Sequence, residues 1–300
     1  MRILIADDNA VSRRMLEGAL VRLGYEVQTC AEGRQALEGL LAPDGPRLAI
    51  LDWMMPGVSG LGVCRQVRAS ATHYVYIVLL TSRDRRDDVL AAYDAEVDDF
   101  LPKPFDVVEL RARLRSGERV LALQERLLAI QEALRVEATR DPLTGLWNRR
   151  MILEQLHLEL ERACREGHGV AVSVADLDYF KEINDQHGHV FGDAVLRAAT
   201  ARLQSVLRSY DFIGRFGGEE FLVIMPGCEA GLAMSIAERA RRAMDEAPLE
   251  VDGRQMQLTV SLGVACSSPG MTDPVALIHA ADQALYRAKA SGRNRIEIHT

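Results

Sequence analysis

Short apolar runs alternate with amphipathic segments of helical spacing throughout the first 118 residues. The apolar runs occupy residues 3–6, 27–30, 48–51, 75–80 and 100–101. Because strands that alternate with helices usually pair in parallel, this pattern predicts one parallel sheet with helices on both faces. Ligands of such folds bind beyond the carboxyl ends of the strands.

The second half of the chain has a different pattern, centred on Gly217-Gly218. Apolar strands at residues 210–216 and 221–225 flank this pair, which predicts a hairpin because glycine readily adopts the positive φ of a tight turn. Asn148 is the predicted cap of a helix that ends near Glu166. The pattern also predicts helices at 194–207, 230–247 and up to about 290, and strands at 170–175, 258–265 and near the last residues.

Between the two halves, residues 107–138 contain no proline and a single glycine, as expected of a long helix. Five apolar positions are spaced 3, 4, 3 and 4, which is a heptad pattern. Such a stripe packs either on the helix's own domain or against a second copy of the helix. For a linker between two domains, here residues 119–138, we favour a parallel dimeric stalk. The stripe consists of Val120, Leu123, Leu127, Ile130 and Leu134.

The composition is that of a folded protein with room for two domains, because 300 residues are 48% hydrophobic and 26% charged. A net charge of −7 argues against a general nucleic-acid-binding surface. The five cysteines show no CxxC spacing, so reduced thiols are expected. No apolar run approaches the roughly 20 residues of a membrane helix, and the first residues do not form a signal peptide. We therefore expect a cytoplasmic protein without membrane insertion.

Polar side chains follow four of the predicted strands in the first domain. A single acidic residue in such a place is usually a cap or a turn residue, but five residues of complementary chemistry indicate a site. Three carboxylates suit a hard cation such as Mg²⁺, and a carboxylate can also attack phosphorus to form an aspartyl-phosphate. A lysine would balance the charge, and a threonine hydroxyl would donate to a phosphoryl oxygen. The residues are Asp7, Asp8, Asp52, Thr81 and Lys103.

Together with Met55-Pro56-Gly57, these residues resemble the receiver domains of bacterial two-component response regulators, over residues 1–118. The resemblance implies a flavodoxin-like (βα)5 fold and phosphorylation of Asp52 by a sensor histidine kinase. It implies a metal ion held by Asp8, Asp52 and the Met54 carbonyl. The residues expected to respond to phosphorylation are Asp7, Thr81, Phe100 and Lys103.

A second group of carboxylates is predicted in the C-terminal half. Asp176 closes one strand and Glu219 lies at the hairpin, so a sheet that pairs these strands would bring both to one edge. With nucleotide phosphates, such oxygens complete the octahedral shell of Mg²⁺. Because successive strand side chains point to opposite faces, pleating alone would not direct Glu219 and Glu220 to the same ligand.

Two further pairs have both a binding and a structural interpretation. Lys289 and Arg293 would either hold triphosphate oxygens or simply interact favourably with the end of a helix. Asn184 and Asp193 would either cap and turn the chain or pair with a guanine edge, which needs an amide and a carboxylate.

These motifs resemble the GGDEF family of diguanylate cyclases, in its GGEEF form, over residues 139–300. The family implies an α+β palm-like nucleotide cyclase fold, a sheet with helices on one side, joined here to the receiver by the long helix. It also implies condensation of two GTP molecules into cyclic di-GMP. The matching segments are Asp141-Pro142-Leu143-Thr144, Asp176-Leu177-Asp178, Phe180-Lys181, Gly188-His189, Gly192-Asp193, Gly217-Gly218-Glu219-Glu220-Phe221 and Lys289 to Asn294.

Roles follow from position in these motifs. The resemblance implies that Asp176, the Leu177 carbonyl and Glu219 bind Mg²⁺ or Mn²⁺, and that Glu220 is also at the catalytic site. Asn184 and Asp193 would read guanine. The remaining substrate-binding residues would be Lys181, Lys289 and Arg293, the last two through phosphates.

The resemblance also implies a homodimer, because each domain holds one GTP and two must meet with twofold symmetry. Product inhibition is expected at Arg208 and Asp211, with Arg239 as a contact from a second subunit. The structural alternative for the first two is an arginine at a helix end and an aspartate in a turn.

Each domain has one alternative interpretation. The second domain would be a binding module that senses cyclic di-GMP or GTP without turnover, or the receiver would be an unphosphorylated dimerisation scaffold. The intact motifs of both domains argue against these alternatives.

Overall fold

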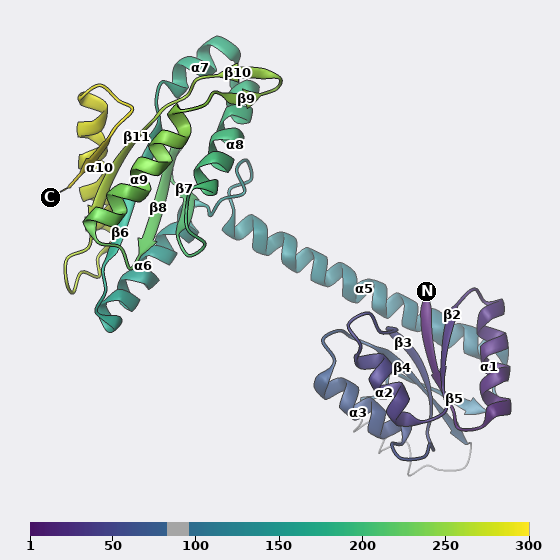
Figure 1. The fold of residues 1–300 in the computed structure, drawn as a ribbon. Helices are drawn as coiled ribbons and strands as arrows, with labels where there is room; N and C mark the ends of the chain where they lie inside the picture. The colour runs from purple at the N-terminus through teal and green to yellow at the C-terminus, as the bar shows by residue number, and fades with distance from the viewer. Residues whose placement is uncertain (83–95, 300) are drawn as a thin grey trace. The chain divides into compact units, whose positions relative to one another are not determined.

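The computed structural model describes residues 1–82 and 96–299, and the chain divides into two compact units, residues 1–132 and 133–300. The first unit contains a five-stranded parallel sheet of order β2-β1-β3-β4-β5 (Figure 1). All five strands lie within two residues of the apolar runs that predicted them. They are β1 (Arg2–Ala6), β2 (Glu26–Cys30), β3 (Leu48–Asp52), β4 (Tyr76–Ser82) and β5 (Asp99–Lys103).

Helices cover both faces of this sheet, as the strand–helix alternation predicted. On one face, α1 (Ala10–Arg22) and the first half of α5 (Val107–Thr139) bury a cluster with Ile3 and Ile5 of β1. On the other face, α2 (Gly33–Leu41) and α3 (Gly60–Ser70) pack against Leu4 and Leu51. The carboxyl ends of the strands therefore stay open at one edge, where parallel sheets bind ligands.

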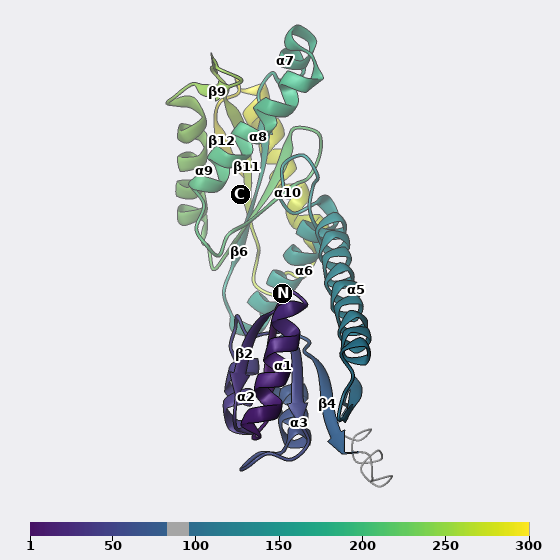
Figure 2. The same cartoon turned by 90° about the vertical axis from the view of Figure 1, so that its right-hand side faces the viewer.

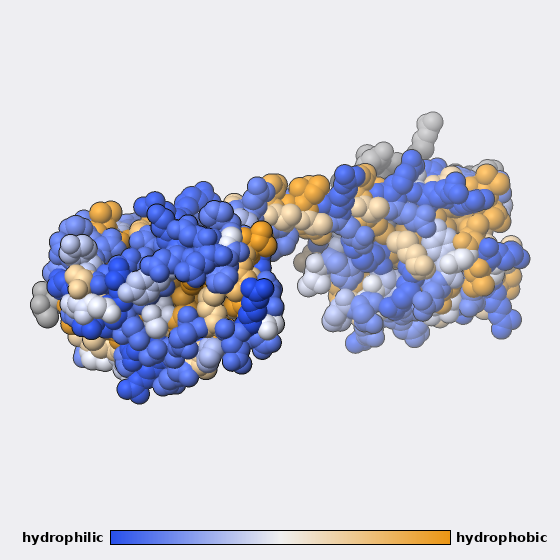
Figure 3. Space-filling view, turned by 90° about the horizontal axis from the view of Figure 1, so that it is seen from above, coloured by the Kyte–Doolittle hydropathy of each residue, from blue (hydrophilic) through white to orange (hydrophobic). Residues whose placement is uncertain are grey.

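The long helix α5 has two different halves. Leu110, Leu114 and Leu121 are buried against the sheet of the first unit. Gly117 approaches Tyr76 so closely that a Cβ would lie 2.6 Å from a ring carbon, which explains the only glycine in this helix. Beyond these contacts the surface of the helix shows hydrophobic atoms (Figure 3). No helix in the described part of the chain is both long enough and apolar enough to cross a membrane.

The second unit is built on another five-stranded sheet, of order β12-β11-β6-β8-β7. The central strand β6 (Val170–Leu177) is buried throughout and pairs antiparallel with both β8 (Glu220–Pro226) and β11 (Val260–Cys266). The predicted hairpin joins β7 (Phe212–Arg215) to β8, but neither Gly217 nor Gly218 has the positive φ that the prediction assumed. At the other edge, β12 (Ile296–Ile298) pairs in parallel with β11.

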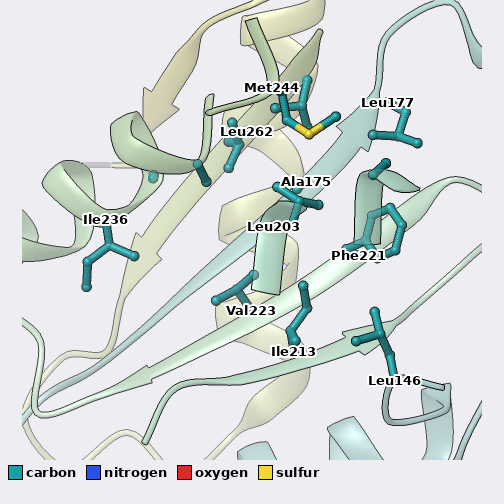
Figure 4. Close-up of a cluster of buried hydrophobic side chains, with 14 of the residues drawn as sticks. Leu146, Ala175, Leu177, Leu203, Ile213, Phe221, Val223, Ile236, Met244 and Leu262 are labelled. Carbon is teal, nitrogen blue, oxygen red and sulfur yellow. The ribbon is translucent and has the colours of Figure 1, made fainter. Parts of the chain in front are cut away.

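Helices cover both faces of this second sheet, so the expectation of helices on one side was wrong (Figure 2). One face packs against α8 (His189–Ser205) and α9 (Ala230–Asp245), with apolar side chains from β6, β8 and both helices in one cluster (Figure 4). The other face packs against α6 (Arg149–Glu166) and α10 (Pro274–Ala290). The physical reason is that β6 is apolar on both sides, and such a strand must be covered on both.

Boundaries of the smaller elements differ from the sequence prediction. Asn148 caps α6 as predicted, because its side-chain oxygen accepts from the Met151 amide at 3.0 Å. The polar segment after β6 is a helix, α7 (Phe180–His187), and α8 begins at His189 rather than at residue 194. The short hairpin of β9 (Leu249–Val251) and β10 (Arg254–Met256) was not predicted, since its strands have only three residues each.

Candidate functional site

The first unit brings three carboxylates together at the carboxyl edge of its sheet. Asp7 and Asp8 follow β1 and Asp52 ends β3, and one oxygen from each lies within 4.8 Å of the others. Asp7 is held in place by Ser12, whose hydroxyl donates to its Oδ2 at 2.6 Å. Three hard oxygen ligands in such a cluster fit Mg²⁺, which usually binds a few carboxylates and keeps several waters.

Lys103 neutralises this cluster from the end of β5. Its Nζ lies 2.9 Å from Oδ2 of Asp7 and 2.9 Å from Oδ2 of Asp52. Burial acts to lower the pKa of Lys103, but its hydrogen bonds to both carboxylates outweigh this effect and raise the pKa. Burial raises the pKa of Asp52 despite the nearby ammonium group. The arrangement is one aspartate beside a candidate cation site, with a lysine able to contact added phosphoryl oxygens.

Other predicted receiver residues lie around this edge. Thr81 is half-buried near the end of β4, paired with Pro102 of β5. Phe100 lies on β5 and packs against the cluster under α2 and α3. Met54 is 69% exposed in the loop after β3, so only its backbone is available to the cation site.

In the second unit, the pairing of β6 with β8 brings Asp176 to the same end of the sheet as both carboxylates of the hairpin. Asp176 of β6 lies directly opposite Glu220 of β8, so their side chains share one face of the sheet. The Glu220 carboxylate also turns back over Gly217, where an added Cβ would lie 2.4 Å from its Oε2. Glu219 lies one residue earlier, and its carbonyl accepts from the Leu177 amide at 3.3 Å.

Lys289 joins this group from the last turn of α10. Its Nζ lies 2.7 Å from Oδ2 of Asp176. Burial raises the pKa of Asp176, and Lys289 acts against that shift. Arg293 follows in a left-handed conformation, with its guanidinium 4.7 Å from the centre of the Tyr179 ring. The two predicted phosphate-binding cations therefore flank the Asp176 edge.

The predicted guanine-reading residues meet where α7 is followed by α8. Asn184 lies on α7, and its side-chain oxygen is so close to Gly192 that a Cβ there would be 1.9 Å away. Asp193 is the next residue on α8 and is half-buried. The missing side chain at Gly192 thus leaves room for the Asn184 amide against the first turn of α8. Lys181 is exposed on the first turn of α7.

An arginine links the Gly217-Gly218 turn to the loop that follows α5. Arg215 donates to the Gly218 carbonyl at 3.0 and 2.8 Å, and its other nitrogen lies 3.2 Å from the Asp141 carboxylate. Asp141 in turn accepts from the Thr144 hydroxyl at 2.7 Å. Arg215 therefore couples the conformation of the Gly217-Gly218 turn to the loop that follows α5.

The residues predicted to bind product are paired with one another. Arg208 lies 2.6 Å from Asp211, whose side chain is fully buried, and also donates to the Cys228 sulfur at 2.9 Å. Hydrogen bonding to Asp211 raises the pKa of Arg208 further. Arg239 lies on α9, donates to the Val206 carbonyl at 2.7 Å, and lines a cavity of about 540 Å³.

Sequence reasoning missed three of these contacts. It assigned no role to Cys228 or to the second aspartate of Asp176-Leu177-Asp178. The Asp141–Arg215 pair had a signal, the Asp-x-x-Thr spacing of a capped turn, but its partner lies 74 residues away.

Comparison with known proteins agrees with this geometry. Residues 138–295 match the family described as "Diguanylate cyclase, GGDEF domain", and residues 3–115 match "Response regulator receiver domain". The response regulator PleD of Caulobacter vibrioides is 35% identical over 298 residues, which are 98% of this chain and 65% of that protein. The chain thus spans about two thirds of that relative's length. The diguanylate cyclase DgcP of Pseudomonas aeruginosa is 40% identical over 194 residues, 63% of this chain and 29% of that one.

Solved structures give the same result for the second unit. The coiled coil and GGDEF domain of DgcB from Caulobacter crescentus, in complex with c-di-GMP, matches 63% of this chain and 98% of that chain. The TM-score is 0.56 at 33% identity. Diguanylate cyclase SiaD of Pseudomonas aeruginosa, solved with its activator SiaC, matches 63% of this chain and 74% of that one, with a TM-score of 0.52 at 36% identity. The chain therefore belongs to the GGDEF diguanylate cyclase family and carries a response-regulator receiver domain ahead of its GGDEF domain.

Proposed function

We propose that the protein is a diguanylate cyclase that converts two GTP molecules into cyclic di-GMP and two pyrophosphates, and that phosphorylation of Asp52 raises this activity. The observation that carries the proposal is the register of β6 and β8. It sets Asp176 opposite Glu220, while Lys289 reaches Asp176 at 2.7 Å. Oxygen ligands for a metal ion and a cation for phosphate thus share one edge of the sheet.

In each half-reaction the 3′-oxygen of one GTP bonds to the α-phosphorus of the other, and the bond from that phosphorus to pyrophosphate breaks. The hydroxyl proton passes to a carboxylate of the turn. Asp176, the Leu177 carbonyl and the turn carboxylates would hold Mg²⁺ or Mn²⁺, which supplies charge stabilisation at the phosphoryl oxygens. Lys289 would exchange Asp176 for a phosphate oxygen, and Arg293 would bind a second one.

Guanine recognition falls to Asn184 and Asp193. An amide and a carboxylate together offer the donor and the acceptors that a guanine edge pairs with. Because one domain holds one GTP, the two nucleotides react only when two domains face each other. Catalysis then depends mainly on how often and how well the domains meet.

We propose that the receiver controls how often two GGDEF domains meet. β5 carries Lys103 at the phosphorylation site and Asp99 at its other end. Asp99 lies 2.8 Å from Arg113 of α5, so one strand contacts both the site and the stalk helix. A phosphoryl group on Asp52, donated by a sensor histidine kinase, would add negative charge next to Lys103 and shift this strand.

Feedback by the product is proposed at Arg208 and Asp211. A planar guanidinium can bind a guanine edge or a phosphate through two bonds, and the carboxylate can accept from guanine. Binding would require the Arg208–Asp211 pair to open. Arg239 already lines a cavity and would contribute from a second subunit.

The test is incubation of the purified protein with GTP and Mg²⁺, with and without beryllofluoride as a phosphoryl mimic. Cyclic di-GMP is expected, with two pyrophosphates per product. Glu220→Ala should lower turnover by about 100-fold or more, as when a group that stabilises the transition state is removed. Glu229→Ala, an exposed acidic residue just before α9, is the matched control and should keep the wild-type rate.

The same assay distinguishes a diguanylate cyclase from a module that only binds GTP or cyclic di-GMP. If the activated wild-type protein retains labelled GTP or cyclic di-GMP but forms no product, the enzyme proposal is wrong. The receiver would then control a sensor domain rather than a synthase.

A further inference from the structure

Asp178 is the second carboxylate of the Asp176-Leu177-Asp178 segment, yet its surroundings differ from those of Asp176. It is only 3% exposed. Its Oδ1 accepts from the Ser261 hydroxyl at 2.7 Å, and its Oδ2 accepts from the Thr259 hydroxyl at 2.7 Å. Oδ2 also accepts from the Asn294 amide at 3.0 Å. With three of about four acceptor positions occupied, the carboxylate has little capacity left for a metal ion.

The third of these bonds joins two distant parts of the chain. Asn294 follows Arg293, and both are left-handed, with φ of 46° and 59°. Non-glycine residues rarely adopt this conformation, so the segment needs outside contacts to hold it. Asp178 supplies one contact, and Arg241 of α9 supplies another by donating to the Asn294 side chain at 2.9 Å.

This segment carries one of the two cations of the proposed active site, Arg293, and the other, Lys289, lies just before it on α10. Lys289 is the penultimate residue of α10, and Arg293 lies three residues before β12 begins. Neither cation is on a strand that pairs with β6, because β11 lies between β6 and β12. The distance from the cations to the Asp176 edge is therefore not set by a backbone ladder between neighbouring strands. For Arg293 it is set instead by the contacts that hold the 293–294 segment, and the bond from the Asn294 amide to Asp178 is one of them.

We propose that Asp178 is a positioning residue that sets the spacing between the phosphate-binding cations and the metal-binding carboxylates. The inference rests on the proposed function of this site. When the carboxylate is removed, the 293–294 segment loses its anchor, and Arg293 and Lys289 no longer meet the triphosphate together. The metal ligands stay in place because β6 and β8 hold them.

The test uses the full-length protein and a non-hydrolysable GTP analogue, with Mg²⁺ titrated, alongside steady-state kinetics. Asp178→Ala should weaken analogue binding and raise KM for GTP about tenfold, while the Mg²⁺ concentration at half-saturation stays unchanged. Asp178→Asn, which keeps the size and one acceptor oxygen, should restore most of the affinity. Glu159→Gln is the matched control, because Glu159 is also a buried carboxylate of this unit but lies on α6.

A second route avoids altering Asp178. Thr259→Val with Ser261→Ala removes two of the three bonds and should shift KM in the same direction. Combined with Asp178→Ala, these changes should add little, since residues that act through one contact are not additive. This route also decides the question if Asp178→Ala fails to fold.

Three results would overturn the proposal. One is a Mg²⁺ requirement that Asp178→Asn raises as much as Asp176→Asn does, which would make Asp178 a metal ligand. Another is full additivity of the combined variants. A wild-type protein that does not bind the analogue overturns this inference and the proposed function together, whereas binding without turnover overturns only the proposed function.

Discussion

At the scale of single residues, two of the cations that the proposed function uses are already paired with carboxylates in this structure. Arg208 is bound by Asp211 and Cys228, and Lys289 is bound by Asp176. Each pair lowers the cost of burying a charge, because a buried carboxylate without a partner is strongly destabilising. A ligand that binds to Arg208 or Lys289 must therefore first break the ion pair that this residue makes with its aspartate.

Product feedback can be tested most cleanly at Arg239. Its guanidinium makes one hydrogen bond, to the Val206 carbonyl, and no ion pair with it is seen among the described residues. Arg239→Ala should keep the initial rate of synthesis and let product accumulate several-fold beyond the level at which the wild type stops. Product-inhibition curves at several GTP concentrations measure this, with a noncompetitive pattern expected for the wild type.

Arg208→Ala serves as the companion variant. It should also relieve feedback, but it leaves the buried Asp211 carboxylate unpaired and should lower the thermal midpoint as well. Superimposable inhibition curves for the wild type and both variants would refute the feedback site.

The carboxylate of Glu238 gives a prediction about pH. Hydrogen bonds from Arg241, with Arg242, lower its pKa from 4.5 to about 2. Because the folded-state pKa is depressed, the stability it contributes is complete above about pH 4.5 and is lost as the pH falls toward 2. The contribution is modest, about 1 kcal/mol or less, since the pair is partly exposed.

Thermal unfolding of wild type and Glu238→Gln between pH 2.5 and 7 measures this effect. The variant should be less stable at pH 7, and the difference should shrink below pH 4.5. Glu229→Gln, at an exposed position without a side-chain cap bond, should give a small difference that does not change with pH. A Glu238→Gln difference that stays constant down to pH 2.5 would contradict the assignment.

At the scale of elements, α5 presents different faces to different partners. Besides its buried leucines, it is tied to the first unit by Glu118, which accepts from Tyr25 at 2.7 Å, and by Glu125, which lies 2.7 Å from Arg47. The heptad stripe lies on another side and remains exposed. The exposed fractions are 66% for Leu123, 51% for Leu127, 47% for Ile130 and 59% for Leu134.

An exposed apolar stripe of this regularity favours pairing with a second copy of the helix. Leu127→Glu with Leu134→Glu should therefore shift the protein from dimer to monomer and lower product formation at least tenfold, because the two GTP sites no longer meet. Light scattering coupled to size exclusion measures the first change, and the GTP assay measures the second.

Leu158→Glu is the matched control, because Leu158 is equally exposed, at 51%, but lies on α6. It should leave both oligomeric state and rate unchanged. A dimer that survives the double change in α5 would show that the stripe does not form the interface.

At the scale of the whole molecule, the proposed function requires a change at Asp52 to act on a reaction that two GGDEF domains carry out together. Joining two cyclase domains through one stalk raises their effective concentration toward millimolar. To control the rate, a receiver that shifts between two states needs only to change how the two copies of the stalk helix pair. No direct contact between the receiver and the substrate is required.

Asp52→Asn tests this coupling. Under saturating beryllofluoride, the wild type should be several-fold more active and more dimeric than without it, whereas Asp52→Asn should not respond. Asp44→Asn is the control, because Asp44 lies on the surface away from the acidic cluster and should respond like the wild type. Equal activation of the wild type and Asp52→Asn would contradict control through this aspartate.

The sequence by itself determined the features that depend on local periodicity and chemistry. Apolar runs predicted all five strands of the receiver sheet, since a buried parallel strand must be apolar along its length. Polar residues at the ends of those runs predicted the cluster of Asp7, Asp8 and Asp52, because parallel strands end at one edge. The Asn148 cap followed from a local side-chain preference, and the place of the hairpin from the Gly217-Gly218 pair, although neither glycine has a positive φ.

Only the tertiary structure decided which distant residues become neighbours. The register of β6 against β8 placed Glu220 directly opposite Asp176, and a slip of one residue would have placed Glu219 there instead. The chain also had to bring residue 294 to residue 178, and residue 215 to residue 141, before the roles of Asp178 and Arg215 could appear. The register of two strands and the pairing of distant residues depend on how whole faces of the domain pack together. A local pattern in the sequence does not contain this information.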